Sequence, residues 1–379
     1  MSHDYTIACY YFPNYHIDPR NEAAHGPGWT EWELVKRAEP RFPDHRQPRV
    51  PAWGYEDESD PAVMAKKIAA AADHGVDVFL FDWYHYEDGP FLERGLDRGF
   101  LGAGNNNRLK FALMWANHNW VDIHPAKISA TIRTAPLLYP GAVSRAGFDR
   151  ITDLVIECYF KHPSYWLLDG RPYFSIYELH TLIEGLGGIA ATADALASFR
   201  AKVKAAGFPD LHLNDVAWDL AILPGETALK DPQRTLETLG FDSITSYVWI
   251  HHVRMPTFPE TPYVEVMAGA VAHWQRTVQT FDLPYFPNVT MGWDSSPRTV
   301  QSDVFINAGY PFTPTLSGNT PAAFREALAR AKSFLDVRPA VPKILTINAW
   351  NEWTEGSYLE PDTVYGMEYL EAIREVFGA

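Results

Sequence analysis

The 379 residues include 32 Lys and Arg against 47 Asp and Glu, which gives a formal net charge of −15 at pH 7. This charge argues against nucleic acid and anionic membrane surfaces as partners, and it fits poorly with a strongly anionic polymer substrate. Hydrophobic residues make up 46% of the chain and aromatic residues 14%, which is enough for a large core, and no apolar run reaches the length of a membrane span.

The two cysteines and the start of the chain indicate the compartment. Cys9 lies in an apolar strand-like segment and Cys158 in a helical pattern, so both are expected to be buried thiols rather than a disulfide. The first apolar segment begins without a leader of the signal-peptide type. We therefore expect a cytoplasmic protein.

Eight apolar segments are predicted to form strands. Most of them are almost continuously apolar, which is typical of parallel strands that are buried on both faces. In chain order they cover residues 6–12, 76–83, 109–116, 172–177, 211–216, 243–248, 287–292 and 343–347.

Helical patterns alternate with these strands. Asp60 followed by Pro61 is typical of a helix start, and Gly75 of its end. Eight strand-helix units predict an α/β fold, a (β/α)8 TIM barrel that forms one domain over residues 1–379. The segment 14–54 is too long for a simple connection, so we expect an elaborated loop over the active face. The other predicted helices cover residues 144–160, 191–206, 263–281, 320–335 and 365–377.

In such barrels the chemistry takes place at the C-terminal ends of the strands. Almost every predicted strand ends in an aromatic residue together with a hydrogen-bonding side chain, a combination that indicates a carbohydrate cleft. Two residues of the long loop are added to this set. The predicted substrate-binding residues are Tyr10, Tyr11, His16, Trp29, Glu31, Asp82, Trp83, Tyr84, Trp115, Asn117, His118, Asn119, Tyr177, Tyr247, Trp293, Asp294, Arg298, Trp350 and Asn351.

Some of these polar side chains have a structural alternative. Arg298 could pair with Asp294 instead of contacting substrate, and the two readings are about equal. Glu31 could brace the long loop rather than line the cleft. Glu178, directly after the fourth predicted strand, could cap the helix that follows it.

The last predicted strand runs into two carboxylates, Glu352 and Glu355, which are flanked by Trp350 and Trp353 and followed by Gly356. Aromatic rings can receive the apolar face of a sugar, and they can desolvate one carboxyl enough to keep it protonated near neutral pH. Two acids in an exposed loop are the alternative. The position at the end of a barrel strand favours catalysis, so both residues are the predicted catalytic pair.

Adjacent histidines at 251 and 252 raise the question of a metal site. Neighbouring residues on a strand or loop point apart, and no carboxylate at a suitable spacing completes a ligand set. We therefore expect no metal ion and no cofactor.

Five motifs together resemble the glycoside hydrolase family 99-like domain, whose bacterial members are often named WbsX-type glycosyltransferases. The resemblance extends from about Thr6 to the C-terminus. The motifs are YYFPNYH at 10–16, GWTEW at 28–32, WANHNW at 115–120, GWDSSPR at 292–298 and NAWNEWTEG at 348–356.

The resemblance implies the chemistry of endo-acting α-mannosidases that retain configuration. It assigns Glu355 as the general acid/base and Glu352 as the base that removes the proton of the sugar 2-hydroxyl, which leads to an anhydro-sugar intermediate. Family tyrosines map onto Tyr247 and onto Tyr10 or Tyr11. The segment Asn117-His118-Asn119 departs from the mannosidase pattern, which affects the identity of the substrate more than the chemistry.

The sequence thus predicts a retaining glycoside hydrolase that acts on a manno-configured linkage, an α-mannoside or α-L-rhamnoside, in an oligo- or polysaccharide. A glycosyltransferase of surface polysaccharide synthesis ranks lower, because neither a Rossmann half with a nucleotide-sugar site nor an Asp-x-Asp motif at a strand end is present. A non-catalytic carbohydrate-binding barrel would keep the aromatic residues and lose the acids, yet both Glu352 and Glu355 are present.

Overall fold

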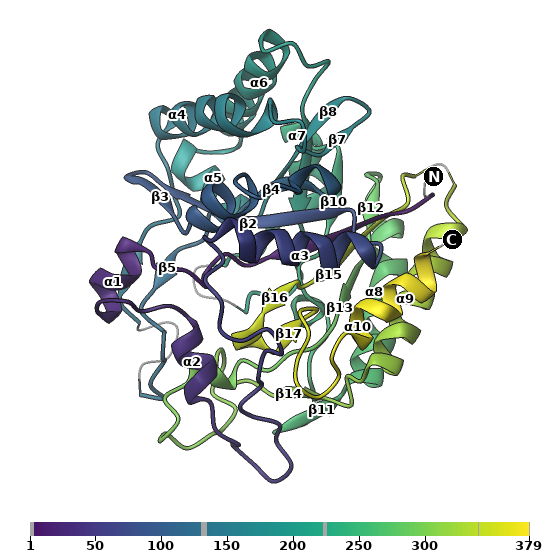
Figure 1. Ribbon diagram of the computed structural model, residues 1–379. Helices are drawn as coiled ribbons and strands as arrows, with labels where there is room; N and C mark the ends of the chain where they lie inside the picture. Colours follow the sequence, from purple (N-terminus) through teal and green to yellow (C-terminus); the bar gives the residue numbers. More distant parts are fainter. Residues whose placement is uncertain (1–3, 130–134, 223–225, 340, 379) are drawn as a thin grey trace.

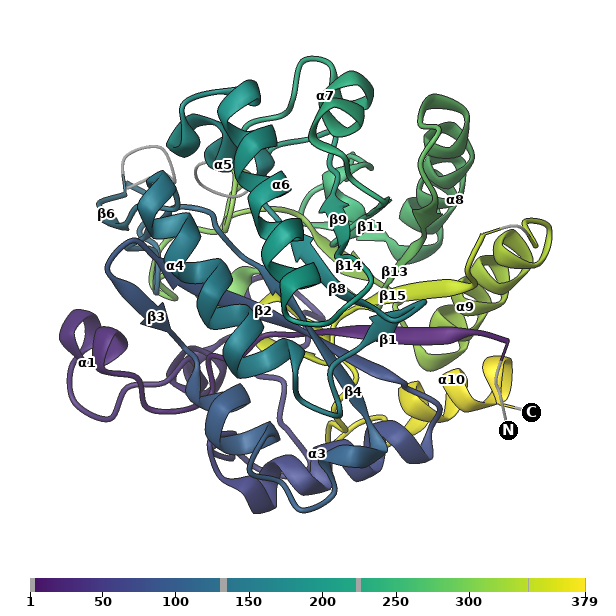
Figure 2. The same ribbon diagram turned by 90° about the horizontal axis from the view of Figure 1, so that it is seen from above.

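The computed structural model describes residues 4–129, 135–222, 226–339 and 341–378. A parallel barrel forms its centre, and helices surround it (Figures 1 and 2). The barrel strands are β1 (Thr6–Tyr11), β2 (Val78–Tyr86), β4 (Lys110–Trp115), β8 (Arg171–Ile176), β9 (His212–Val216), β10 (Ser243–Thr245), β12 (Tyr285–Phe286), β13 (Asn288–Thr290) and β15 (Ile344–Asn348).

The circle of pairings closes through a seventh strand position that is split in two. β12 pairs with β10, and β13 pairs with β15, which pairs in turn with β1; every one of these pairings is parallel. Pro287 separates the two pieces, and it has no N–H to donate to the ladder. Its carbonyl still accepts a hydrogen bond of 3.0 Å from the Thr346 N–H. The predicted (β/α)8 barrel is confirmed.

The strand bounds differ from the prediction by one to three residues at one or both ends, and β2 extends to Tyr86 rather than 83. The seventh strand position begins at Tyr285 rather than 287, since Tyr285 pairs with Ile244 of β10. The sixth strand ends at Thr245 rather than 248, because the chain turns there toward a short 3-10 helix, Trp249–His251. Cys158 also differs: it is exposed, whereas Cys9 is buried as expected.

Five of the α-helices (α1, α3, α4, α7 and α9) begin at a residue whose side chain caps the first turn. Asp60 accepts a hydrogen bond from the Ala62 N–H at the start of α3, and Thr320 accepts one from the Ala323 N–H at the start of α9. The α-helices are α1 (Pro19–His25), α2 (Trp32–Arg37), α3 (Pro61–Asp73), α4 (Arg145–Val155), α5 (Leu179–Leu186), α6 (Ile189–Ala205), α7 (Pro232–Leu239), α8 (Tyr263–Thr280), α9 (Pro321–Asp336) and α10 (Glu368–Phe377).

Eight further short strands lie outside the circle of barrel strands. One of them, β16, forms a hairpin with β17 directly after the last barrel strand. The segment 14–54 contains α1 and α2 and no barrel strand. The short strands are β3 (Gly89–Phe91), β5 (Trp120–Val121), β6 (Leu137–Tyr139), β7 (Leu167–Leu168), β11 (Glu260–Pro262), β14 (Thr315–Ser317), β16 (Asn351–Glu352) and β17 (Ser357–Tyr358).

Membrane-spanning helices were considered for the described parts of the chain. None of the single helices there combines the length and the apolar composition that a membrane span needs, and only α5 and α6 taken together, with a bend of 99° between them, meet both conditions.

Polar side chains fill part of the barrel interior. Ser175 Oγ donates to Asn214 Oδ1 at 2.8 Å, and the Asn214 side-chain amide donates to Ser243 Oγ at 2.9 Å. On the other side, the Asn288 amide donates to Thr346 Oγ1 at 3.2 Å. These layers satisfy buried polar groups inside the barrel and support the floor of the site above them.

Candidate active site

A pocket opens at the C-terminal ends of the barrel strands. Both predicted catalytic acids line it, and residues within β2 and β4 or after β1, β4, β8, β10 and β13 complete the wall. The lining residues are Phe12, Asp82, Tyr84, Met114, Ala116, His118, Asn119, Trp120, Val121, Ile123, His124, Tyr177, Tyr247, Arg298, Tyr310, Glu352 and Glu355.

The β16–β17 hairpin positions the two acids. Glu352 ends β16 and Glu355 ends the short 3-10 helix that follows. Gly356 then turns the chain back with a φ of 65°, a left-handed conformation that favours glycine. A Cβ at Gly356 would also lie 2.7 Å from the Cβ of Asp294, so a larger residue would displace the hairpin.

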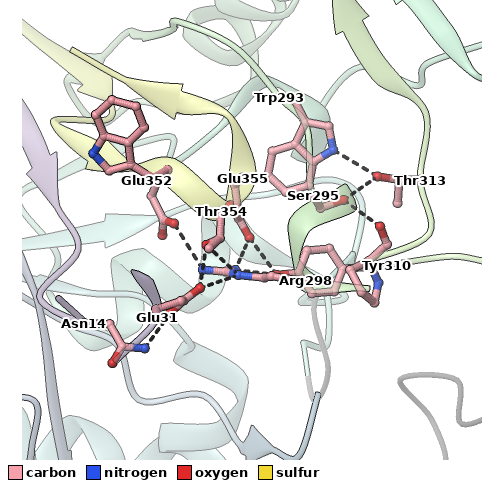
Figure 3. Close-up of polar contacts among 12 residues, drawn as sticks. Asn14, Glu31, Trp293, Ser295, Arg298, Tyr310, Thr313, Glu352, Thr354 and Glu355 are labelled. Atoms are coloured by element: carbon pink, nitrogen blue, oxygen red, sulfur yellow. Dashed lines mark hydrogen bonds and ion pairs between the residues drawn. The ribbon is translucent and has the colours of Figure 1, made fainter. Parts of the chain in front are cut away.

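Arg298 joins the acids from below, as Figure 3 shows. Its Nη2 donates to Glu352 Oε2 at 3.2 Å, and its Nη1 donates to Glu355 Oε1. Its Nε donates to Glu31 Oε1 at 2.8 Å, and Tyr310 donates to Glu355 Oε1 at 2.7 Å. One buried guanidinium thus contacts three carboxylates, a geometry that suits the planar fork of arginine.

Glu31 is the permanent counterion of Arg298. Burial opposes its ionisation, but Arg298 and His124 together with hydrogen bonds from Thr354 and Arg298 lower the pKa of Glu31 below its ordinary value. The charge of the guanidinium is therefore already matched by one carboxylate. Only part of the positive charge of Arg298 therefore remains to stabilise the ionised forms of Glu352 and Glu355.

The catalytic candidates and Asp82 hold protons more strongly than ordinary carboxyls. Burial raises the pKa of Glu352 well above its usual value, and the nearby Glu355 adds to the effect. Burial also raises the pKa of Glu355, although Arg298 and the Tyr310 hydrogen bond oppose it. Burial likewise raises the pKa of Asp82. The buried pocket thus favours the protonated forms of these carboxyl groups more than water does.

Tyr247 links two of these acids across the barrel mouth. Its hydroxyl lies 2.8 Å from Asp82 Oδ2 and 3.2 Å from Glu352 Oε1. Tyr10 supports it from beneath, with ring centroids 4.7 Å apart, while the Tyr10 hydroxyl donates to the Ser246 carbonyl. Tyr247 lines the pocket and Tyr10 does not.

Aromatic rings make the opposite wall. Trp120 and His124 stack with ring centroids 5.3 Å apart, and Tyr84 meets Trp120 edge-on at 5.4 Å. Burial lowers the pKa of His124 to about 3, and it also lowers the pKa of His118, so both imidazoles are neutral near pH 7. This uncharged aromatic wall opposite a row of carboxyls suits a sugar, with an apolar face and a hydroxylated edge.

Two of the tryptophans predicted to bind substrate, Trp83 and Trp115, do not line the pocket. Side chains alternate along a strand, so Asp82 and Tyr84 of β2 enter the pocket while Trp83 packs outward against Tyr159. Trp115 points outward in the same way, and its Nε1 donates to the His85 carbonyl.

Other predicted residues tie loops together outside the pocket. The Asn117 amide bonds to the backbone of Glu178, and the Asn351 amide bonds to the backbone of Phe12. Tyr11 donates to Glu58, and His16 lies 3.6 Å from the same carboxylate. Trp350 donates to Glu360, Trp293 donates to Thr313, and Trp29 packs on His25.

Asp294 does not pair with Arg298. It accepts hydrogen bonds from His45 at 2.9 Å and Gln47 at 2.7 Å, and Arg49 lies 3.6 Å away. All three partners come from the long segment 14–54. Asp294 therefore anchors that segment to the barrel, while Arg298 forms ion pairs with Glu31, Glu352 and Glu355.

Tyr310 and His124 belong to the pocket but were missing from the prediction. Tyr310 lies in the loop between β13 and β14, and His124 follows β5, so neither is at the end of a barrel strand. No motif in the sequence distinguishes either of them. Their place depends on how the loops pack.

Solved structures share this fold. The family 99 endo-α-mannosidase of Bacteroides thetaiotaomicron matches with a TM-score of 0.60, over 99% of this chain and 96% of its own, at 15% identity. A protein described as glycoside hydrolase-like matches with a TM-score of 0.61, over 100% of this chain and 95% of its own, at 16% identity. At these identities the likeness shows the fold alone.

Sequence comparison identifies relatives and a matching family model. Two proteins from Xanthomonas campestris pv. campestris, both described as uncharacterized protein WxcX, are 28% identical over 387 residues. The alignment covers 98% of this chain and 49% of theirs, so the chain spans about half the length of these curated relatives. A family model described as glycosyltransferase WbsX matches residues 7–373. Since that match covers nearly all of the chain, the resemblance noted in its motifs is confirmed, and the protein belongs to the glycosyltransferase WbsX family.

Proposed function

We propose that the protein is a retaining glycoside hydrolase that cleaves an α-mannoside or α-L-rhamnoside linkage in an oligo- or polysaccharide. The observation that carries the proposal is the meeting of Glu352 and Glu355 in one buried pocket, where both contact Arg298. Burial raises the pKa of both acids, so the pair can hold the proton that a leaving glycosidic oxygen needs.

In the proposed first step, Glu352 takes the proton of the substrate 2-hydroxyl while the 2-oxygen attacks C1. The bond from C1 to the leaving oxygen breaks, and that oxygen receives a proton from Glu355. The intermediate is an anhydro-sugar bridged between C1 and C2. In the second step water attacks C1 and gives its proton to Glu355, while the bond from C1 to the 2-oxygen breaks and that oxygen regains a proton from Glu352. Two inversions at C1 retain the configuration.

Without substrate, the contacts in the pocket favour protonation of Glu352 over Glu355, which is the reverse of what the proposed reaction needs. Arg298 and Tyr310 both donate to Glu355, which favours its ionised form, whereas burial and the neighbouring Glu355 raise the pKa of Glu352. The proposed roles require Glu352 to be ionised and Glu355 protonated. A substrate 2-hydroxyl that donates to Glu352 favours that state, because a hydrogen bond to a carboxylate stabilises its charge.

Glycosyl transfer is the second candidate, and the description of the family favours it. The same two steps transfer a sugar when an acceptor hydroxyl replaces water. The two candidates differ in the product formed when an acceptor oligosaccharide is supplied. A purely carbohydrate-binding barrel is disfavoured, because it would have no use for two carboxyls of raised pKa beside one arginine.

The proposed function is tested with a panel of aryl α-mannosides and α-L-rhamnosides and the matching oligosaccharides. We expect release of the sugar, with the α-anomer appearing first when the reaction is followed by proton NMR before mutarotation. The β-anomer as first product would contradict retention. Release only when an acceptor sugar is present, with the sugar attached to it, would establish transfer instead.

Tyr310 is predicted to set the alkaline limb of the pH profile. Its hydroxyl donates to Glu355 at 2.7 Å, and losing a bond to an ionised group costs about 1.5–3 kcal/mol. Tyr310→Phe should therefore raise the pKa of Glu355 and move the alkaline limb of kcat/KM up by about one to two pH units, at about 1.4 kcal/mol per unit. The profile of kcat/KM against pH measures this shift.

Tyr247→Phe is the matched control for this prediction. The Tyr247 hydroxyl contacts Asp82 and Glu352 rather than Glu355. Its loss should leave the alkaline limb in place and raise the acidic limb, since the pKa of Glu352 would rise. If Tyr310→Phe moved the acidic limb instead, Glu355 would be the base of the pair and Glu352 the acid.

A further inference from the structure

A second cavity lies apart from the active site, among the loops after β9 and β10 and helices α5, α7 and α8. It encloses about 330 Å³. Trp218 lines it, while Tyr177, whose ring centroid is 4.9 Å from that of Trp218, lines the active-site pocket. The two sites are therefore separated by a layer of aromatic side chains.

Three potential metal ligands meet in this cavity. Asp219 follows β9, His252 follows the short 3-10 helix after β10, and His273 lies on α8. One ligand atom from each lies within 4.8 Å of the other two. Asp219 Oδ2 is 3.5 Å from His252 Nδ1 and 3.4 Å from His273 Nδ1.

These spacings suit ligands that share an ion. Two atoms that each lie about 2.1 Å from a tetrahedral zinc ion are about 3.4 Å apart. As hydrogen bonds the same contacts are poor, because 3.4–3.5 Å exceeds the usual N–H···O distance.

The hydrogen bonds of His273 leave its Nδ1 without a proton. Thr277 Oγ1 donates its one proton to the His273 carbonyl at 3.0 Å. It must then accept from His273 Nε2 at 3.1 Å, so Nε2 carries the ring proton. The lone pair of Nδ1 therefore faces the Asp219 carboxylate. In a neutral ring these two lone pairs face each other, and a bound cation, either a proton or a metal ion, relieves their repulsion.

His252 supplies an independent observation. Its side chain is only 2% exposed, and neither ring nitrogen has a hydrogen-bond partner among the residues that the structure describes. Its ring stacks on that of His273 with centroids 3.7 Å apart and an angle of 18° between the planes, so one ring must turn out of the stack before both can direct a nitrogen at one ion. A buried imidazole without partners is costly, and coordination of a metal would satisfy it.

We propose that Asp219, His252 and His273 bind a divalent transition metal ion of the zinc type, with the fourth position open to the cavity. Two imidazoles favour such an ion over calcium or magnesium, which prefer oxygen ligands. Thr277 holds His273 in the required tautomer from behind, as is typical of histidine ligands. The proposal stands independently of the glycosidase chemistry, since none of these residues lines the active-site pocket.

The sequence did not indicate this site because only one of the two adjacent histidines, His252, belongs to it. His251 points to Glu226, with 3.4 Å between Nε2 and Oε1, so the adjacent histidines do point apart as expected. The carboxylate and the second imidazole come instead from residues 219 and 273, which are distant in sequence.

The test is calorimetric titration of the full chain, freed of metal by chelation, with zinc chloride. We expect one equivalent of Zn²⁺ to bind, and Asp219→Asn and His252→Gln each to weaken binding by about 100-fold or more. His180→Gln is the matched control, because His180 lines the same cavity and is outside the cluster. Thr277→Val should weaken binding by about 10-fold, the effect of losing a positioning residue.

Folding is monitored by far-UV circular dichroism, and Asp219→Asn keeps the test valid because the Asp219 side chain is 60% exposed and its loss removes no core contact. Cobalt in place of zinc should give the intense visible bands of tetrahedral coordination, and these should disappear in folded Asp219→Asn. Failure of the wild-type chain to bind Zn²⁺, or unchanged affinity in Asp219→Asn and His252→Gln, would overturn the proposal.

Discussion

Replacing Glu355 with Gln is expected to slow the cleavage of substrates with poor leaving groups by about 10²–10⁴-fold, the usual contribution of a general acid. Aryl glycosides with strongly activated leaving groups should lose far less, because their departing oxygen needs little protonation. Glu355 lines the pocket, and burial raises the pKa of its carboxyl, while Arg298 and Tyr310 oppose that rise. The measurement is kcat/KM for a series of leaving groups.

The contrast between substrates separates a chemical role from a structural one. Gln can still accept hydrogen bonds from Arg298 and Tyr310, so the packing around position 355 should survive. An unchanged thermal unfolding midpoint would verify this. Equal losses on good and poor leaving groups would remove the acid role of Glu355. In that case Glu352, whose pKa burial also raises, would be the candidate acid.

Loss of the substrate 2-hydroxyl is the second change with a large expected effect. If Glu352 activates that hydroxyl, 2-deoxy and 2-fluoro glycosides should bind as competitive inhibitors and fail to turn over. The reason is geometric: the 2-oxygen must attack C1 from the side opposite the leaving group. α-Mannosides and α-L-rhamnosides present these oxygens trans and diaxial in their relaxed chairs. α-Glucosides, in which they are cis, should not react.

Glu352→Gln is the corresponding change in the protein. It should depress activated and poor leaving groups alike, because the base is needed whatever the leaving group is. Efficient hydrolysis of a 2-deoxy glycoside or of an α-glucoside would show that the hydroxyl is not the nucleophile. Glu352 would then act as a direct nucleophile or as the base for water, and its separation from Glu355 would decide between them.

Arg298 explains how so many acids are tolerated in one buried place. Isolated buried carboxylates are costly, and a guanidinium repays that cost only when its geometry is good and the remaining lone pairs are satisfied. Here the fork reaches Glu31, Glu352 and Glu355 at once, and Thr354 also donates to Glu31. Glu31 keeps the arginine in place, so the field at the two catalytic candidates stays fixed.

The sequence by itself determined the barrel. Continuous apolar runs can be buried only between two layers, and Asp60-Pro61 and Thr320-Pro321 fix where helices begin. It also predicted that Glu352 and Glu355 follow the last barrel strand, because the apolar run of that strand ends just before them. Strand alternation, a property of the sequence too, could have shown that Trp83 points away from Asp82 and Tyr84.

Only the tertiary structure decided which charges meet. Arg298 pairs with Glu31, which is 267 residues away in the chain, and not with the nearby Asp294. Tyr310 reaches the acids from a loop with no recognisable motif. The physical reason is the same in both cases. Electrostatic and hydrogen-bond energies depend on separation in space, and the conformations of long loops that set this separation follow from packing against the whole barrel, not from local sequence.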